Sequence, residues 1–395
     1  MALKARVGRI PATKPNWSSP VSASYTFKTS VLTAALGAEQ REAIRETARL
    51  QISFQSLLRE GEYLRHQRDF AGDGQDQLFV LPNPWRMMLL TAPSGASTLE
   101  LDPLPFWAVV GASVVVEDNS NMEAGTISVI AGTTVTLQSP LTNSFAIGSQ
   151  VRPAYLARAQ ETATFNAKTA QVRQGAVTYE VDPTSDPQAA ATITHDTFES
   201  SDVFLTSPNW IRDVTSAFNA ARAMLDPSRG NIDVRSPRGF SVTVQKMQYT
   251  ETTAGKAEAL LSFFLKMKGK RTSFFMPTWQ TDMRSKALAA TASSALTVDG
   301  MEFFDAFDGS PIWNTIYVKY PDGSYQINRI ASMVVSGTDT VLTMVDGWNS
   351  DVPAEKSLSW CPRWRFASDI LKLNWPTSAV AEASISVQTL ISEAP

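Results

Sequence analysis

The sequence has little of the chemistry that most enzyme sites use. Its one cysteine, Cys361, excludes an intrachain disulfide. Its two histidines, His66 and His195, lie far apart and do not have the spacing of metal ligands. No P-loop, nucleophile elbow or zinc pattern is present. We therefore expect no enzyme activity, no cofactor and no metal, and we expect stability to come from packing and assembly.

Charged residues are also scarce, at 18% of 395 residues with a formal net charge of −3. Because Lys and Arg are scattered rather than gathered in a stripe, nucleic acid is not an expected partner. No apolar run approaches the roughly 20 residues of a membrane span. The basic N-terminal residues 1–14 lack the apolar core of a secretory signal, so we expect synthesis in the cytoplasm. The low charge suits a surface that neighbours cover.

What the sequence does contain is an internal repeat. Four segments recur in the same order in the second half of the chain, at separations that grow from 193 to 209 positions. They are Pro15-Asn16-Trp17 with Pro208-Asn209-Trp210, Phe79–Pro82 with Phe274–Pro277, Gly132–Leu137 with Gly337–Leu342, and Arg152-Pro153 with Cys361-Pro362. Small insertions in the second copy would make the separation grow in this one direction.

The repeat predicts a mainly β chain with two tandem, diverged copies of a β-sandwich module. Each copy is expected to have one short helix and an inserted small β-barrel-like domain. The expected parts are an N-terminal arm (1–14), copy 1 (15–182, with its insert at about 90–152), a linker (183–207) and copy 2 (208–391, with its insert at about 285–361). The linker begins where Asp182-Pro183 and Asp186-Pro187 interrupt regular structure.

Hydrophobic spacing predicts the elements inside each copy. Helices are expected at 54–70, with Leu57 and Leu58 on the apolar face, and at 254–268, with Thr252 or Thr253 as the cap. Each copy is expected to end in one long strand. The strands expected in the inserts and at the ends of the copies are 113–117, 126–137, 315–320, 324–335, 340–345, 162–181 and 370–390.

Two groups of basic residues are candidates for contacts between subunits. Arg41, Arg45 and Arg49 follow one another at four-residue steps. Such a row suits either a solvated helix face with acidic neighbours at Glu42 and Glu46, or a surface that meets a neighbouring subunit. The second group, Lys270 and Arg271, follows a glycine at the end of the second expected helix, where basic residues favour the helix dipole.

Aromatic and acidic residues leave other functions open. Trp313 and Trp348 lie in turn-like segments and are the candidates for exposed aromatic rings that could stack on sugars. A receptor- or carbohydrate-binding tail protein is therefore the alternative function. The pairs Asp305/Asp308 and Asp299/Glu302 could suggest a glycan-degrading enzyme. Asp is common in such turns for local hydrogen bonding, which makes that third function the weakest of the set.

One combination of motifs carries a resemblance to a known family. A Gly-x-Glu-x-Arg run, a helix, a Phe-Phe pair, a Gly-Lys or Gly-Arg turn and an aromatic strand resemble the distal tail proteins of siphophages and gene-transfer agents. The residues are Gly37, Glu39 and Arg41 in the first half and Phe263, Phe264, Gly269, Arg271 and Asp282 in the second. The resemblance covers about half the chain and excludes the inserts. It implies a structural virion protein of a bacteriophage tail tip or baseplate, without catalytic residues.

The resemblance also implies partners and a symmetry. The chain would form a homo-oligomeric ring and contact the tail tube protein, tail hub or fibre proteins and the tape-measure protein, in a virion assembled in the bacterial host cytoplasm. Tail tubes are sixfold and central spikes threefold. Three chains with two modules each would present six pseudo-equivalent modules, and we favour this trimer over a plain hexamer.

Overall fold

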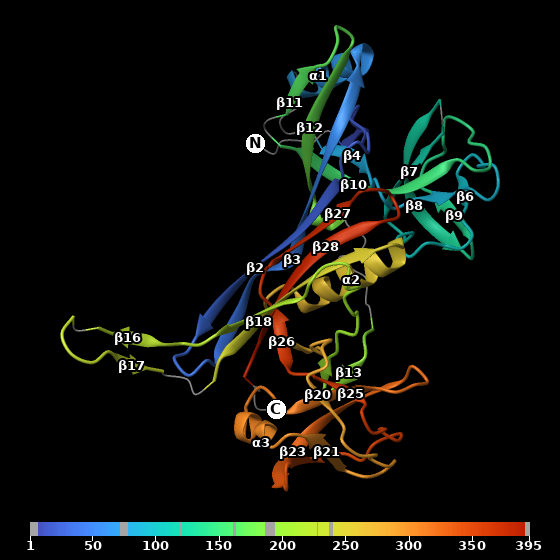
Figure 1. Cartoon of the computed structure of the whole chain (residues 1–395). Coiled ribbons are helices and arrows are strands. Elements are labelled where there is room, and N and C mark those ends of the chain that lie inside the picture. The colour runs from blue at the N-terminus through green and yellow to red at the C-terminus, as the bar shows by residue number, and fades with distance from the viewer. Residues whose placement is uncertain are drawn as a thin grey trace.

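The computed structural model describes residues 7–71, 78–118, 120–160, 163–185, 194–226, 228–236 and 240–391. The outermost residues of the expected N-terminal arm (1–6) and the middle of the expected linker (186–193) lie outside these ranges. Within the described residues the chain is mainly β, as predicted, with three α-helices and one short 3-10 helix, η2 (Pro183–Ser185). Figure 1 shows an elongated molecule with two small β domains beside a long central sheet.

The central sheet contains eight antiparallel strands, four from each half of the chain. Each strand pairs with the next in the order β11, β12, β3, β2, β27, β28, β18, β15. Their bounds are β11 (Thr164–Ala167), β12 (Val172–Val181), β3 (Glu39–Arg59), β2 (Val21–Thr33), β27 (Ile370–Trp375), β28 (Ala381–Thr389), β18 (Val242–Glu251) and β15 (Thr215–Asn219). The two halves therefore share one sheet, which is joined where β2 meets β27.

Alternation of side chains explains why these residues form strands. In β2, Val21, Ala23, Tyr25 and Phe27 are buried, and the residues between them point outward. The inner half of β3 alternates in the same way. Beyond Phe27 this hairpin runs past the core as a projecting arm. Successive strand residues face opposite sides of a sheet, so this pattern fixes which face of the sheet is covered.

A second layer leads from the sheet to the inserts. In the first half, β10 (Gln150–Ala159) pairs with β12 and with β4 (Leu78–Pro82), and β4 pairs with β1 (Val7–Arg9). In the second half, β26 (Arg363–Phe366) pairs with β28 and with β19 (Phe274–Phe275). These short strands carry the chain from the shared core to the base of each insert.

Helix α2 (Ala254–Met267) packs its aromatic face against the sheet. Phe263 and Phe264 are buried, and their rings lie 5.0 Å from Phe274 and 5.8 Å from Phe27, respectively. The helix begins where the spacing predicts it. Thr253 occupies the cap position without a side-chain hydrogen bond, so the expected cap chemistry is wrong. Left-handed backbone at Lys268 ends the helix.

Two expectations about local structure are also wrong. Helix α1 (Glu60–Ala71) begins later than predicted, because β3 stays paired with β12 through Arg59 and keeps Leu57 and Leu58 in a strand. The long final strands are each broken by a turn, which separates β11 from β12 and β27 from β28. In both cases a strand pairing, rather than local hydrophobic spacing, decided the boundary.

Each insert has a hydrophobic cluster of its own. The first includes Trp107 and Phe145, and the second includes Trp348 and Trp360. The first insert contains β5 (Met88–Leu89), β6 (Thr98–Glu100), β7 (Ser113–Glu117), β8 (Met122–Ala131) and β9 (Thr134–Leu137). The second contains β20 (Met283–Arg284), β21 (Ala295–Asp299), α3 (Glu302–Phe307), β22 (Thr315–Lys319), β23 (Tyr325–Ser336), β24 (Asp339–Met344) and β25 (Ser357–Trp360). A bridge between Ser285 and Val298 nearly closes the second into a barrel.

The hairpin of the first half recurs in the second half at a constant separation of 193 positions. Ser22 pairs with Ser53, and Thr215 pairs with Lys246. Towards the tip, the pair Val31 with Arg41 recurs as Met224 with Val234, which join β16 (Ala223–Leu225) to β17 (Asp233–Arg235). The remaining short pair, β13 (Thr197–Phe198) with β14 (Ser201–Asp202), precedes this second hairpin.

Other pairings recur in order after the helices. Phe79 pairs with Ala157, and Phe274 pairs with Trp364. In the inserts, the pair Ala131 with Thr134 recurs 205 positions later as Ser336 with Asp339. The tryptophans of the two Pro-Asn-Trp segments both have positive φ, 53° at Trp17 and 56° at Trp210. That the chain contains two diverged copies stays a prediction, and this shared register supports it.

The packing of α2 generates a prediction. Replacing Phe264 with Ala removes a buried ring and leaves a cavity, so we expect the core transition to lose about 3–5 kcal/mol. Urea unfolding followed by tryptophan fluorescence measures the loss. Leu288→Ala, at an exposed position, is the matched control and should leave the midpoint unchanged. Equal midpoints for Phe264→Ala and the control would contradict the role assigned to α2.

Candidate functional site: the junction of the two halves

The two halves meet along a strand pair whose end is fixed by one carboxylate. β2 pairs with β27 from Val21–Trp375 to Thr26–Ile370. Just before β27, the side chain of Asp369 accepts hydrogen bonds from Thr29 N (2.7 Å), Thr29 Oγ1 (3.0 Å) and Lys270 N (2.9 Å). Asp369 therefore ties the first-half arm to the turn after α2. No sequence pattern distinguishes this aspartate from others in turns.

The arginine row lies on a strand. Arg41, Arg45 and Arg49 all belong to β3, so the interpretation as a solvated helix face is wrong. Pairing with β2 along nearly its whole length keeps this segment extended. Arg45 Nη1 donates to the backbone oxygen of Thr26 at 3.1 Å, which holds that side chain across the hairpin. Steps of four residues return to one face of a regular strand, but shifts of the β2–β3 register on both sides of Arg45 interrupt that alternation here.

The basic turn after α2 contacts the first half of the same chain. Glu46 on β3 accepts from Lys268 Nζ (2.5 Å) and from Arg271 Nη1 (2.7 Å). The hydrogen bond from Lys268 holds the pKa of Glu46 below its ordinary value, with Arg271 adding to the effect. Arg271, expected to contact another subunit, is thus engaged within the chain. Lys270 contributes its backbone N–H to Asp369.

A buried ion pair joins the arm of the first half to the second half. Arg365 on β26 donates from Nε to Glu39 Oε2 (2.7 Å) and from Nη2 to Glu39 Oε1 (2.9 Å). Their side chains are only 7% and 4% exposed. Arg365 Nη2 also donates to Gln388 Oε1 at 3.3 Å. This fork-to-fork geometry is directional, so it positions the arm tip on β26 as well as attracting it.

A second buried ion pair lies at the base of the first insert. Arg86 donates from Nε and Nη2 to the two carboxylate oxygens of Glu258 on α2, at 2.7 and 2.8 Å. Burial opposes the charge on Arg86, but Tyr155 and Glu258 outweigh it, so the net shift of its pKa is upward. Beside this pair, Trp85 stacks on Trp375 with ring centroids 5.3 Å apart. The sequence gives no signal for the ion pair, whose residues are 172 positions apart.

A pocket on the first half corresponds in position to the Arg365 site on the second. We call it the arginine pocket. Its volume is about 490 Å³, and its charged lining residues are Arg45, Arg49, Arg158, Glu180 and Asp182. Arg158 is paired with Glu180 across β10 and β12, as Arg365 is paired with Gln388 across β26 and β28. In the second half Glu39 occupies this position, whereas in the first half the corresponding space is open.

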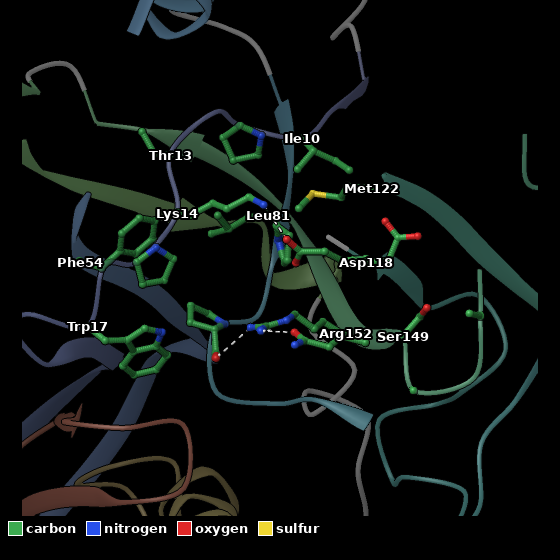
Figure 2. Close-up of a pocket in the computed structure, with 18 of the residues that line it drawn as sticks. Ile10, Thr13, Lys14, Trp17, Phe54, Leu81, Asp118, Met122, Ser149 and Arg152 are labelled. Carbon is green, nitrogen blue, oxygen red and sulfur yellow. Dashed lines mark hydrogen bonds and ion pairs between the residues drawn. The ribbon is translucent and has the colours of Figure 1, made fainter. Parts of the chain in front are cut away.

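Another pocket, of about 430 Å³, lies where the first insert joins the sheet (Figure 2). Lys14 Nζ pairs with Glu117 Oε1 at 2.5 Å on its wall. Arg152 donates to the backbone oxygen of Pro84 at 3.0 Å and to Gln150 Oε1 at 2.7 Å. Burial lowers the pKa of Arg152, and its buried Nε has no hydrogen-bond partner among the described residues. Apolar side chains such as Ile10, Phe54 and Leu81 line the pocket beside these polar groups, so the pocket offers both kinds of contact.

Of the two tryptophans proposed as exposed rings, one is buried and the other is half-buried. Trp348 is 1% exposed and belongs to the core of the second insert. Trp313 is half-buried, and its ring lies 5.9 Å from the ring of Trp360. Turn-like sequence did not reveal that these turns fold back over the barrel interior. Both residues therefore act in packing, and Trp348 is withdrawn as a platform for sugar binding.

Both histidines and one of the four carboxylates singled out from the sequence have contacts that account for them. His66 packs on Phe165 at 4.8 Å and His195 on Phe263 at 4.9 Å, and burial lowers the pKa of His195. Asp299 forms an ion pair with Lys286. Among the described residues, no group of three His, Cys, Asp or Glu side chains could hold a metal ion. In the same part of the chain, no helix is long and apolar enough to cross a membrane.

Comparison with known proteins offers no function to transfer. No family model matches this sequence, and no curated protein matches it either.

The ion pair between Arg86 and Glu258 generates a prediction. Arg86→Ala leaves a buried carboxylate without its partner, so we expect a loss of about 3–5 kcal/mol in unfolding free energy. Replacing both residues with apolar ones, Arg86→Met with Glu258→Leu, should recover most of it. The matched control is Arg284→Ala, which breaks a solvent-exposed pair with Glu355. A loss for Arg86→Ala no greater than for the control, in urea titrations, would contradict this account.

Proposed function

We propose that the chain is a structural ring protein of a tailed-phage tail tip, which joins the tail tube to the tip or baseplate. The observation that carries the proposal is the shared sheet, which ends in β11 on one side and β15 on the other. Among the described residues each of these strands has one strand partner. A bare strand edge is a template for pairing with another chain. Because the two edges differ, such pairing runs head to tail and closes into a ring when the rotation permits.

Exposed apolar side chains support the same assembly. They gather on the arm and edge of the second half, at Trp210, Ile211, Phe218, Met224, Leu225, Ile232 and Val234. Several large exposed apolar groups on one segment of a soluble protein mark a segment that a partner covers. The low fraction of charged residues agrees with a surface that is partly enclosed in an assembly.

The arms supply the surface proposed for the tail tube. The β2–β3 hairpin and the β16–β17 hairpin project to the same side of the molecule (Figure 1). A ring of such chains would present a crown of hairpins to a coaxial neighbour. The hub or fibre proteins would then contact the ring elsewhere, and the inserts are available for that role because each has its own core.

The symmetry of the ring is the testable part. The intrachain junction already joins two modules, so three chains would place six modules in one ring, and this is the assembly we expect. Native mass spectrometry of the purified chain should give three times 43.1 kDa, and negative-stain microscopy should show rings. Rings of six chains would replace the trimer with the hexamer. A stable monomer at micromolar concentration would refute the ring itself.

A further inference from the structure

The two free edges of the sheet correspond to the two strands that join the halves. Tyr25 on β2 pairs with Leu50, and 193 positions later Phe218 on β15 pairs with Thr243. β15 is therefore the counterpart of β2. Similarly, the pair Phe165 with Gly175 recurs 208 positions later as Leu373 with Ala383, so β11 is the counterpart of β27. Within the chain β2 meets β27, and their counterparts are left unjoined.

The junction fixes the register in which the counterparts would meet. Ala23 pairs with Leu373 on the buried face, and Ser24 pairs with Lys372 on the outer face. The counterpart of a β2 residue lies 193 positions later, and the counterpart of a β27 residue lies 208 positions earlier. Ser216 would therefore lie opposite Phe165, and Ala217 opposite Thr164. The two half-buried side chains then fall on one face and the two exposed ones on the other, as they do in the junction.

The exposure of corresponding aromatic residues also indicates that a further strand covers β15. Tyr25, whose strand is covered on both edges, is 1% exposed. Its counterpart Phe218, on the free edge, is 70% exposed. The Pro-Asn-Trp tryptophans differ likewise, since Trp17 is half-buried and Trp210 is 55% exposed. A strand laid against β15 would cover apolar groups that the single chain leaves in water.

The arginine pocket is the counterpart of the site that receives Glu39. In the junction, Glu39 at the tip of the first arm binds Arg365. The second arm has Ile232 at the corresponding position and Asp233 directly after it. Asp233 forms an ion pair with Arg235 in the same strand, and the arginine pocket holds Glu180 and Asp182 beside its three arginines. The arm of the neighbouring chain would fill the space that the first arm fills within the chain, with Ile232 in place of Glu39.

We propose that a second copy of this chain docks here, with β15 of one chain pairing antiparallel with β11 of the next. In the same contact the β16–β17 arm of the first chain enters the arginine pocket of its neighbour. The contact repeats the intrachain junction, so the central sheet continues from chain to chain around the ring. This inference rests on the proposed ring and adds its interface and register.

A cysteine pair tests the register. In one chain, Ala217→Cys with Thr164→Cys should form intermolecular disulfides on mild oxidation, because directly opposed strand residues have Cα atoms about 4.5–5.5 Å apart. Most of the protein should then run on a non-reducing gel as cross-linked oligomers up to the full ring. Each single variant is a control that cannot extend beyond a dimer. The out-of-register control is Ala217→Cys with Ala167→Cys, expected to cross-link at least tenfold more slowly.

The outcomes separate this inference from the proposed function. Rings seen by native mass without in-register cross-links, or equal cross-linking by the out-of-register pair, would overturn the interface and leave the ring standing. A monomer in native mass would overturn both. As a second variant, Phe218→Asp should weaken assembly at least tenfold while leaving the unfolding midpoint of the dissociated chain unchanged. Leu288→Asp, on an exposed position of the second insert, should assemble normally, and equal assembly of both variants would contradict the interface.

Discussion

Strand edges need hydrogen-bond partners, and this structure depends on how that need is met between its halves. The pairing of β2 with β27 turns two four-stranded sheets into one of eight strands. Everything else at the junction acts around this pairing. Asp369 fixes its end, and Glu39 with Arg365 fixes where the arm lies beyond it. Without that strand pair, nothing would hold the donors and acceptors of these polar contacts opposite one another.

The buried ion pairs contribute position more than stability. Removing a charge from water is costly, and a buried pair roughly offsets that cost only when its geometry is good. Arg86 with Glu258 and Arg365 with Glu39 both have the bidentate geometry that meets this condition. Their placement at the two ends of the junction fixes the angle between the halves. For a protein proposed to close a ring, a fixed angle between successive modules is the property that matters.

The inserts are separated from this constraint. Each has its own hydrophobic cluster and joins the shared core through the short strands β10, β4, β26 and β19. Changes in an insert therefore need not disturb the sheet. The core can keep the geometry of a ring while the inserts take on different surfaces.

The sequence by itself determined the mainly β class, the position of α2 and the longer strands of the inserts, because alternation and helical spacing are local. It did not reveal that Arg41, Arg45 and Arg49 lie on a strand, because four-residue steps are compatible with a helix and with a strand. Only the tertiary structure decided which edges pair, that Trp348 is buried, and that Asp369 binds Thr29, 340 positions away. Those contacts depend on how the two halves meet, and a local sequence pattern cannot identify a partner that is distant in the sequence.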